Sequence, residues 1–163
     1  HTFHTLLSLI CTMAPHARQG HIEAAQSIGA IYYLGHGVAI DYERSMAAFK
    51  IGAEAGDAVK QYQVGGMYNI GKGVAVDYKQ ALPWFEKAAA QDHPDAADTL
   101  RSMYCDGLGA TPSWRRAREY YQRSIELGNS EVVEDLQTLN RNIAAVIIAE
   151  SRVTPTPLRS HNK

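Results

Sequence analysis

The apolar positions of residues 22–34 follow the period of a helix. Steps of four, three and one residues separate Ala24, Ile28, Ile31 and Tyr32. That spacing places them on one face of a 3.6-residue helix. Gly35 follows where a left-handed cap is favoured, because glycine has no Cβ to clash. Asp41 is a good N-cap for a second helix, which Gly56 ends. The segment therefore predicts two helices joined by a turn.

The same pattern returns every 36 residues. The first glycine of a Gly-x-Gly turn stands at positions 35, 71 and 107. The same step relates three further sets: Tyr32, Tyr68 and Tyr104; Asp41, Asp77 and Ser113; Phe49, Phe85 and Tyr121. Three copies thus occupy residues 20–55, 56–91 and 92–127. One hairpin cannot bury its apolar stripe alone, so we expect the copies to stack. The prediction is an all-α fold, a right-handed α/α superhelix of helix-turn-helix repeats.

The second copy carries the residues of a known repeat. They are Gly56-Asp57-Ala58, Val64-Gly65-Gly66-Met67-Tyr68, Gly71-Lys72-Gly73-Val74, Asp77-Tyr78 and Ala81-Leu82-Pro83-Trp84-Phe85-Glu86-Lys87-Ala88-Ala89. This pattern resembles the Sel-one-like repeat, a relative of the tetratricopeptide repeats, and the resemblance covers residues 20–128. It implies an α/α superhelix that acts as an adaptor for other proteins, without naming one partner.

Two positions depart from the repeat. Arg101 stands where the other copies have Gly29 and Gly65, which predicts a splayed or less tightly packed third copy. Pro83 falls inside the second helix of copy two, where an interior proline costs about 3 kcal/mol. We therefore expect a kink there or a loose first turn.

The pattern changes after Gly128. The position matching the turn glycine is Ile143, so the helix should continue to about Glu150. An apolar seam runs along it through Val132, Leu136, Leu139, Ile143 and Val146. We interpret residues 128–150 as a capping helix on copy three. Alternatively, residues 132–149 dock a partner or a second copy of the chain. Residues 151–163 contain two prolines and no periodicity, which predicts a disordered tail.

The first 19 residues allow two interpretations. The apolar run Leu6-Leu7-Ser8-Leu9-Ile10 fits a helix that caps the N-terminal end of the array. Residues 1–14 could instead be the remnant of a processed leader, which would favour a secreted or periplasmic protein. The two cysteines lie far apart and form no disulfide framework, which leans toward the cytoplasm or an organelle interior.

Composition narrows the class of protein. The formal net charge of -1 argues against nucleic-acid binding. No apolar stretch approaches the roughly 18 residues of a membrane span. The segment 66–72 matches Gly-x-x-x-x-Gly-Lys, but it lacks the Ser or Thr and the preceding strand that a phosphate loop needs. The seven histidines have no metal-ligand spacing, and Cys105 fits a structural thiol. We expect no enzyme, cofactor or metal site.

The leading prediction is a scaffold that binds another protein along the concave side formed by the first helices. The helical wheel assigns recognition positions on all three first helices: Glu23, Gln26, Ala30 and Tyr33; Val59, Tyr62, Gly66 and Asn69; Asp95, Asp98, Ser102 and Cys105. Tyr62 could equally pack between repeats. The acidic end suggests a peptide with basic residues over copy three. Arg115 and Arg116 add a basic face as a second candidate surface. The alternative is an assembly subunit held in a larger complex by its C-terminal helix.

Overall fold

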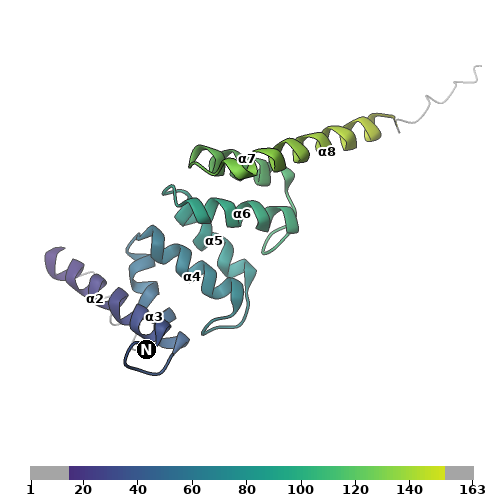
Figure 1. The fold of residues 1–163 in the computed structure, drawn as a ribbon. Helices are drawn as coiled ribbons and strands as arrows, with labels where there is room; N and C mark the ends of the chain where they lie inside the picture. The colour runs from purple at the N-terminus through teal and green to yellow at the C-terminus, as the bar shows by residue number, and fades with distance from the viewer. Residues whose placement is uncertain (1–14, 153–163) are drawn as a thin grey trace, which may run out of the picture.

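The computed structural model describes residues 15–152 (Figure 1). This part of the chain is helical and contains no strand. Its elements are α2 (Pro15–Leu34), α3 (Tyr42–Glu54), α4 (Ala58–Ile70), α5 (Tyr78–Ala89), α6 (Pro94–Asp106), α7 (Trp114–Glu126), the 3-10 turn η1 (Ser130–Val132) and α8 (Val133–Arg152). Each helix packs on the next along the chain. The predicted all-α repeat superhelix is confirmed. Ser151 and Arg152, predicted to begin a disordered tail, are the last two residues of α8. The rest of that predicted tail, 153–163, lies outside the described residues.

The helix ends are set by the residues that repeat. Gly35, Gly71 and Gly107 all have left-handed backbones, with φ of 75°, 72° and 71°. Each closes a first helix, as the sequence predicts. The side chains of Asp41, Asp77 and Ser113 accept from the backbone amides three residues on, at 2.9, 3.0 and 3.4 Å. These N-caps start α3, α5 and α7.

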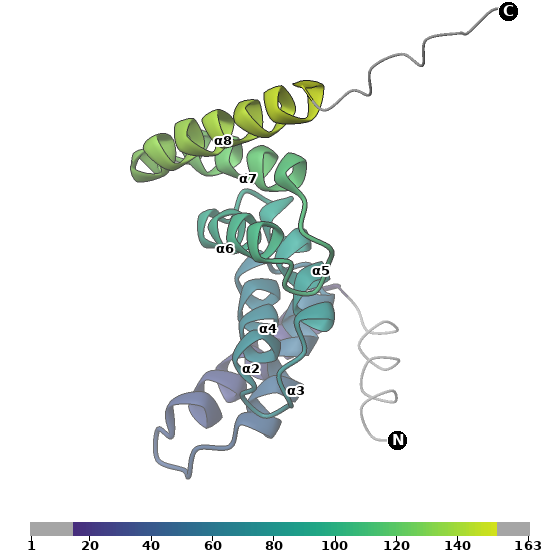
Figure 2. The same ribbon diagram turned by 90° about the vertical axis from the view of Figure 1, so that its right-hand side faces the viewer.

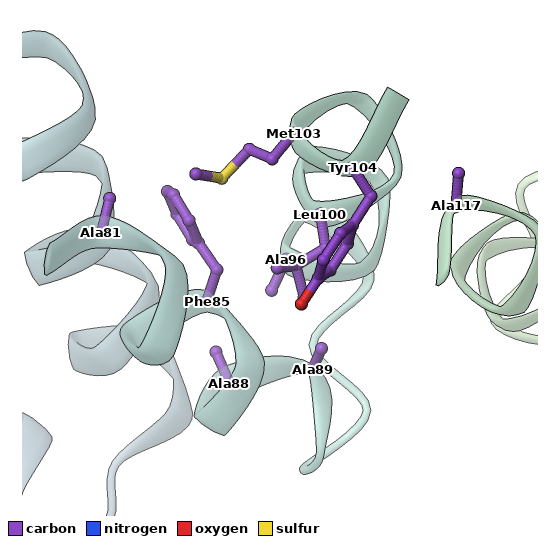
Figure 3. Packing of buried hydrophobic residues seen from close by; sticks show 9 residues of the cluster. All are labelled: Ala81, Phe85, Ala88, Ala89, Ala96, Leu100, Met103, Tyr104 and Ala117. Carbon is purple, nitrogen blue, oxygen red and sulfur yellow. The ribbon is translucent and has the colours of Figure 1, made fainter. Parts of the chain in front are cut away.

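The largest core lies between the second and third hairpins. Figure 3 shows Phe85 of α5 lying between its own helix and the side chains of Leu100 and Met103 on α6. Small residues complete this cluster: Ala81, Ala88 and Ala89 on α5, Ala96 on α6 and, on the far side of Tyr104, Ala117 on α7. Their short side chains let the helices approach closely. Phe85 is only 1% exposed, and its packing on α6 joins the second repeat to the third.

Within a hairpin, an aromatic ring packs on a bare glycine backbone. A Cβ added at Gly29 would stand 2.6 Å from Phe49, and one at Gly65 would stand 2.9 Å from Phe85. In copy three, Arg101 replaces the glycine, and its guanidinium lies 4.9 Å from the centre of the Tyr121 ring. Arg101 also pairs with Asp98 at 3.0 Å. The third hairpin is not splayed at its core, because Ala97 and Ala117 remain fully buried.

Helix α5 runs through Pro83. Its first turn is closed by a 3.0 Å hydrogen bond from the amide of Ala81 to the carbonyl of Asp77. The loose first turn offered as one expectation is therefore not observed. The N-cap of Asp77 fixes this turn before the proline is reached, so the missing amide falls on the second turn.

The C-terminal helix caps the array over only part of its length. Val132 and Leu139 are buried against Tyr121 of α7, with Ile143 packed at the margin. The predicted seam ends there, because Val146 is 56% exposed. The helix also begins differently from the prediction, with a 3-10 turn before α8. Figure 1 shows the end of α8 projecting past α7.

The N-terminal end of the array differs from the sequence prediction. Helix α2 starts at Pro15 and passes through Gly20, so residues 15–19 continue into the first helix of repeat one. Within that helix, Ile28 and Ile31 are 48% and 39% exposed. The apolar stripe predicted for the interior of repeat one is thus largely uncovered by the helices of residues 15–152.

A tyrosine on each later first helix hydrogen-bonds the second helix of the previous repeat. Lys50 Nζ donates to the hydroxyl of Tyr68 at 2.8 Å. One repeat later, the hydroxyl of Tyr104 donates to Glu86 Oε1 at 2.6 Å. Burial, and then this bond to a carboxylate, raises the pKa of Tyr104 above its ordinary value of about 10.

This pKa predicts a loss of stability at alkaline pH. Above about pH 10, Tyr104 ionises in the unfolded chain while the folded chain keeps its proton, so the free energy of unfolding falls as pH rises. Tyr104→Phe removes this contribution. We expect the free energy of unfolding of the variant to fall less steeply with pH. The difference in slope should correspond to the release of up to about one proton on unfolding. Urea unfolding between pH 8 and 11 measures it, and identical slopes in the two proteins would contradict this role.

Candidate functional site

A hollow of about 190 Å³ opens between the first helices of repeats one and two. Its lining is mostly apolar and aromatic: Tyr33, Phe49, Tyr62, Gln63, Gly66, Met67 and Ile70. Figure 2 shows that α4 and α6 lie on one side of the stack and α5 on the other. Three of the predicted recognition residues meet here, namely Tyr33, Tyr62 and Gly66. At these three positions the predicted recognition surface is therefore concave.

Tyr33 forms one wall and is held from two directions. Its ring lies edge-on to Tyr42 at 5.4 Å and tilted against Phe49 at 6.1 Å. Lys72 Nζ donates to its hydroxyl at 2.9 Å and lies 4.6 Å from its ring centre. The hydrogen bond to Tyr33 raises the pKa of Lys72. Lys72, in the Gly-x-Gly turn of repeat two, thus places a positive charge against Tyr33 of repeat one. The repeat pattern alone does not reveal this contact.

Tyr62 also lines the hollow and packs between repeats. Its ring lies 5.5 Å from Phe85 and is stacked on His93 at 4.6 Å. The alternative that Tyr62 packs between repeats is therefore observed, and its role in recognition stays a prediction. The stacking fixes the ring orientation, so this part of the lining is preorganised.

Gly66 lines the hollow with its backbone. A Cβ added there would meet no atom of the described residues within 4 Å, so the backbone of α4 is bare at this point. Gln63 stands one turn earlier, with its side-chain oxygen accepting from Lys60 Nζ at 3.0 Å. Its amide NH₂ remains chemically suited to donate to a peptide carbonyl. The hollow thus combines aromatic walls with a polar rim.

The other positions predicted on α2 and α4 lie outside this hollow. Gln26 Nε2 donates to Asp57 Oδ2 at 2.9 Å, which ties α2 to the N-cap of α4. Glu23 is exposed and accepts from Gln19 at 2.9 Å. Val59 is half exposed, and Asn69 is half-buried near the end of α4. Gln26 is thus an inter-repeat contact in this structure.

The positions predicted on α6 form a less acidic surface than expected. Asp98 pairs with Arg101, so its charge is partly compensated. Asp95 is exposed in the first turn of α6, and Ser102 is half-buried. Cys105 packs at the edge of two core clusters, and burial raises the pKa of its thiol. A raised pKa disfavours the nucleophilic thiolate.

The basic face of α7 is mostly paired within the protein. Arg115 pairs with Glu119 at 3.4 Å, and Arg116 pairs with Glu86 of α5 at 3.5 Å. Arg123 pairs with Asp92 and with Glu126. Arg116 also lies 5.5 Å from the ring centre of Tyr104, which makes it part of the contact between repeats. Arg115 and Arg116 thus carry compensated charges.

A second hollow, of about 170 Å³, lies beside the C-terminal helix. It is lined by Trp114, Leu139, Asn142, Ile143, Val146 and Ile147. Apart from Asn142 these side chains are apolar. This surface corresponds to the alternative prediction that residues 132–149 dock another molecule.

Neither hollow has the groups expected of a catalytic centre. Within residues 15–152, no group of three His, Cys, Asp or Glu side chains is arranged to hold a metal ion. No described helix is long and apolar enough to cross a membrane. The Gly66–Lys72 segment lies on α4 and its turn, which gives no strand-to-helix phosphate loop.

Comparison with protein families identifies the repeat. A family model described as the Sel1 repeat matches residues 22–57, 61–93 and 100–129. The chain belongs to the Sel1 repeat family. Sel1 repeat proteins are generally scaffolds for protein–protein interaction and are typically non-catalytic. Comparison with curated protein sequences gives no match.

Solved Sel1 repeat structures have the same fold. The protective antigen c5321 of uropathogenic Escherichia coli, with an SLR fold, is 34% identical with a TM-score of 0.65, over 69% of this chain and 24% of that one. A Sel1 repeat protein from Oxalobacter formigenes is 27% identical with a TM-score of 0.68, over 83% and 58%. The Helicobacter pylori cysteine rich protein B is similar in fold, at 19% identity and a TM-score of 0.56, over 71% and 89%. The chain thus spans about a quarter and under three fifths of the first two proteins' lengths.

Proposed function

We propose that the hollow between α2 and α4 binds a short segment of another protein, with one apolar side chain anchored between Tyr33 and Tyr62. The observation that carries this proposal is the bare Gly66 backbone in a hollow that the held rings of Tyr33 and Tyr62 also line. At about 190 Å³ the hollow is smaller than the roughly 300–1,000 Å³ of most small-molecule sites. It therefore suits a single anchoring residue of a peptide.

Polar groups at the rim favour a peptide over a purely apolar ligand. Gln63 can donate to a peptide carbonyl, and Lys72 places a positive charge beside Tyr33. We therefore favour a partner segment with an apolar anchor and an acidic residue near it. The basic segment suggested by Asp95 and Asp98 is less favoured, because Arg101 compensates Asp98. The membership of the chain in a family of interaction scaffolds supports the general function.

A larger side chain at position 66 would occupy the hollow, so it tests this proposal without disturbing the core. Gly66→Leu adds a side chain where a Cβ meets no neighbour, and it replaces a glycine within a helix. Peptides are first selected against the wild-type chain from a displayed random library, and their affinities are measured by fluorescence anisotropy. We expect Gly66→Leu to weaken binding by about tenfold or more, equivalent to 1.4 kcal/mol, with an unfolding midpoint at or above wild type.

The matched control is Gly66→Ala, which makes the same change in helix propensity but fills little of the hollow. It should retain most of the affinity. Equal binding by Gly66→Leu and the wild-type chain would show that the selected peptides use another surface.

The apolar hollow at α8 supports a second candidate function. Val146 and Ile147 are exposed beside Trp114 at the projecting end of α8, as expected of a helix that anchors the chain in a larger assembly. Val146→Asp would separate the two functions. It should abolish incorporation into an assembly while leaving peptide binding at Gly66 unchanged.

A further inference from the structure

Two ammonium groups border the hollow between α2 and α4. Lys60 stands in the first turn of α4, and its Nζ lies 5.0 Å from the ring centre of Phe49 and 3.0 Å from the side-chain oxygen of Gln63. Lys72 follows the end of α4, and its Nζ lies 4.6 Å from the ring centre of Tyr33. Because these three neighbours all line the hollow, both positive charges stand beside the surface on which a peptide is proposed to bind.

Neither positive charge is paired with a carboxylate within residues 15–152, where every salt bridge uses an arginine. Asp57 precedes Lys60 by three residues, but its side chain accepts from Gln26 Nε2 at 2.9 Å and from the backbone amide of Lys60 at 3.0 Å. An ammonium group has three N–H donors. Lys60 and Lys72 each donate to a neutral side-chain oxygen, of Gln63 and of Tyr33. Further donors remain for a carboxylate of another molecule.

The aromatic rings position these charges without cancelling them. A ring attracts a cation through its negative face but carries no net charge. Lys72 is held in this way by two rings, since its Nζ also lies 5.0 Å from the ring centre of Tyr42. The Tyr33 hydroxyl accepts from Lys72, so its own hydrogen can donate to a carboxylate that binds there. The end of the hollow at Lys72 therefore offers two kinds of donor to one acidic group.

The separation of the two lysines matches an extended peptide. The axis of α4 rises about 15 Å between Lys60 and the last residue of the helix, Ile70. An extended chain rises about 3.3 Å per residue and projects every second side chain to the same side. Side chains two residues before and two residues after an anchor therefore share its side and stand about 13 Å apart. Gly66 is halfway between the two lysines in the sequence, where the anchor is proposed to lie.

The next repeat lacks this arrangement of charges. Ala96 and Leu108 stand one repeat after the two lysines, on α6 and its turn, and α6 lies on the same side of the stack as α4 (Figure 2). The corresponding surface carries Asp98, which pairs with Arg101, and the exposed Asp106. An acidic segment shifted by one repeat would lose both lysines and meet acidic side chains. The charges therefore favour one position of such a segment along the array.

We propose that the partner segment is an extended acidic peptide, with its apolar anchor in the hollow and carboxylate side chains two residues before and two residues after the anchor, one bound by Lys60 and the other by Lys72. This inference rests on the proposed function and adds the chemistry of the partner. An extended partner fits better than a helical one, because a bound helix buries several side chains along a groove, whereas the hollow accommodates one.

Matched peptides test this inference. The probe is the tightest selected peptide whose binding Gly66→Leu weakens, made with Glu or with Gln at both positions two residues from its anchor. Each ion pair should contribute about twofold to fivefold in affinity, so the Glu version should bind the wild-type chain about fourfold to twentyfold more tightly. Lys60→Gln and Lys72→Gln should each weaken the Glu version by about twofold to fivefold and leave the Gln version unchanged. Fluorescence anisotropy measures all of these affinities.

Lys79→Gln is the matched control, because it makes the same change of charge at an exposed lysine that does not line the hollow. It should leave the affinities of both peptide versions unchanged. Equal binding of the Glu and Gln versions to the wild-type chain would overturn the inference and leave the proposed function standing. Equal weakening of both versions by Lys60→Gln and Lys72→Gln would also overturn it, since the lysines would then act only by supporting the rings. If every selected peptide binds Gly66→Leu as tightly as wild type, the proposed function fails, and this inference fails with it.

Discussion

Phe85→Ala is expected to lower the free energy of unfolding by about 3–5 kcal/mol. The ring is buried between α5 and α6 and contacts the core of two repeats at once. It also packs on the bare backbone of Gly65, where an added Cβ would stand 2.9 Å from the ring. Its removal leaves a cavity that rigid helix backbones cannot close. Urea unfolding monitored by circular dichroism measures the loss.

Val76→Ala is the control for Phe85→Ala. Val76 is largely exposed in the turn before α5, so its truncation should cost within about 0.5 kcal/mol. Because the repeats stabilise each other, hydrogen exchange in Phe85→Ala should accelerate in α6 as well as α5. A loss below about 1 kcal/mol would show that Phe85 does not hold the repeats together.

Gly73→Ala is expected to have the second largest effect, a loss of about 2–5 kcal/mol. About 1–2 kcal/mol comes from the left-handed backbone, and about 1–3 kcal/mol comes from overpacking. The second contribution arises because an added Cβ would overlap the carbonyl of Tyr42 in the preceding repeat. Gly109→Ala should behave alike, since its Cβ would overlap the carbonyl of Tyr78.

Gly128→Ala separates the two contributions to this loss. Gly128 has a positive φ, and no atom of residues 15–152 lies within 4 Å of an added Cβ, so only the backbone contribution of about 1–2 kcal/mol applies. Urea unfolding of the three variants makes the comparison. Equal losses at Gly73 and Gly128 would mean that the turns do not carry the contact between repeats.

The sequence predicts the repeat and its local geometry well, because these depend on residues close together in the chain. The left-handed caps and the N-caps are decided within one turn of helix, so Gly71 and Asp77 could be assigned without coordinates. The burial of Phe85 follows from the same logic, since a stacked hairpin must cover its apolar stripe. The exposure of Ile28 was not predicted, because the repeat pattern is the same in each copy and does not show which apolar face the described helices leave uncovered.

The candidate site was predicted only in part. The helical wheel selected Tyr33 and Tyr62, but it could not show that His93 stacks on Tyr62 or that Lys72 binds Tyr33. Both contacts join residues of neighbouring repeats, so they depend on the rotation between hairpins. The same rotation brings Gln26 to Asp57 and turns a predicted recognition residue into a contact between repeats.

The most direct test of the account is an NMR titration of the isotope-labelled chain with a selected peptide. Binding in the hollow predicts that the largest shift changes cluster at Tyr33, Tyr62, Gly66 and Ile70, and that they disappear in Gly66→Leu. Changes concentrated at Trp114, Ile143 and Val146 would contradict the account, because they would place the interaction surface at the C-terminal helix.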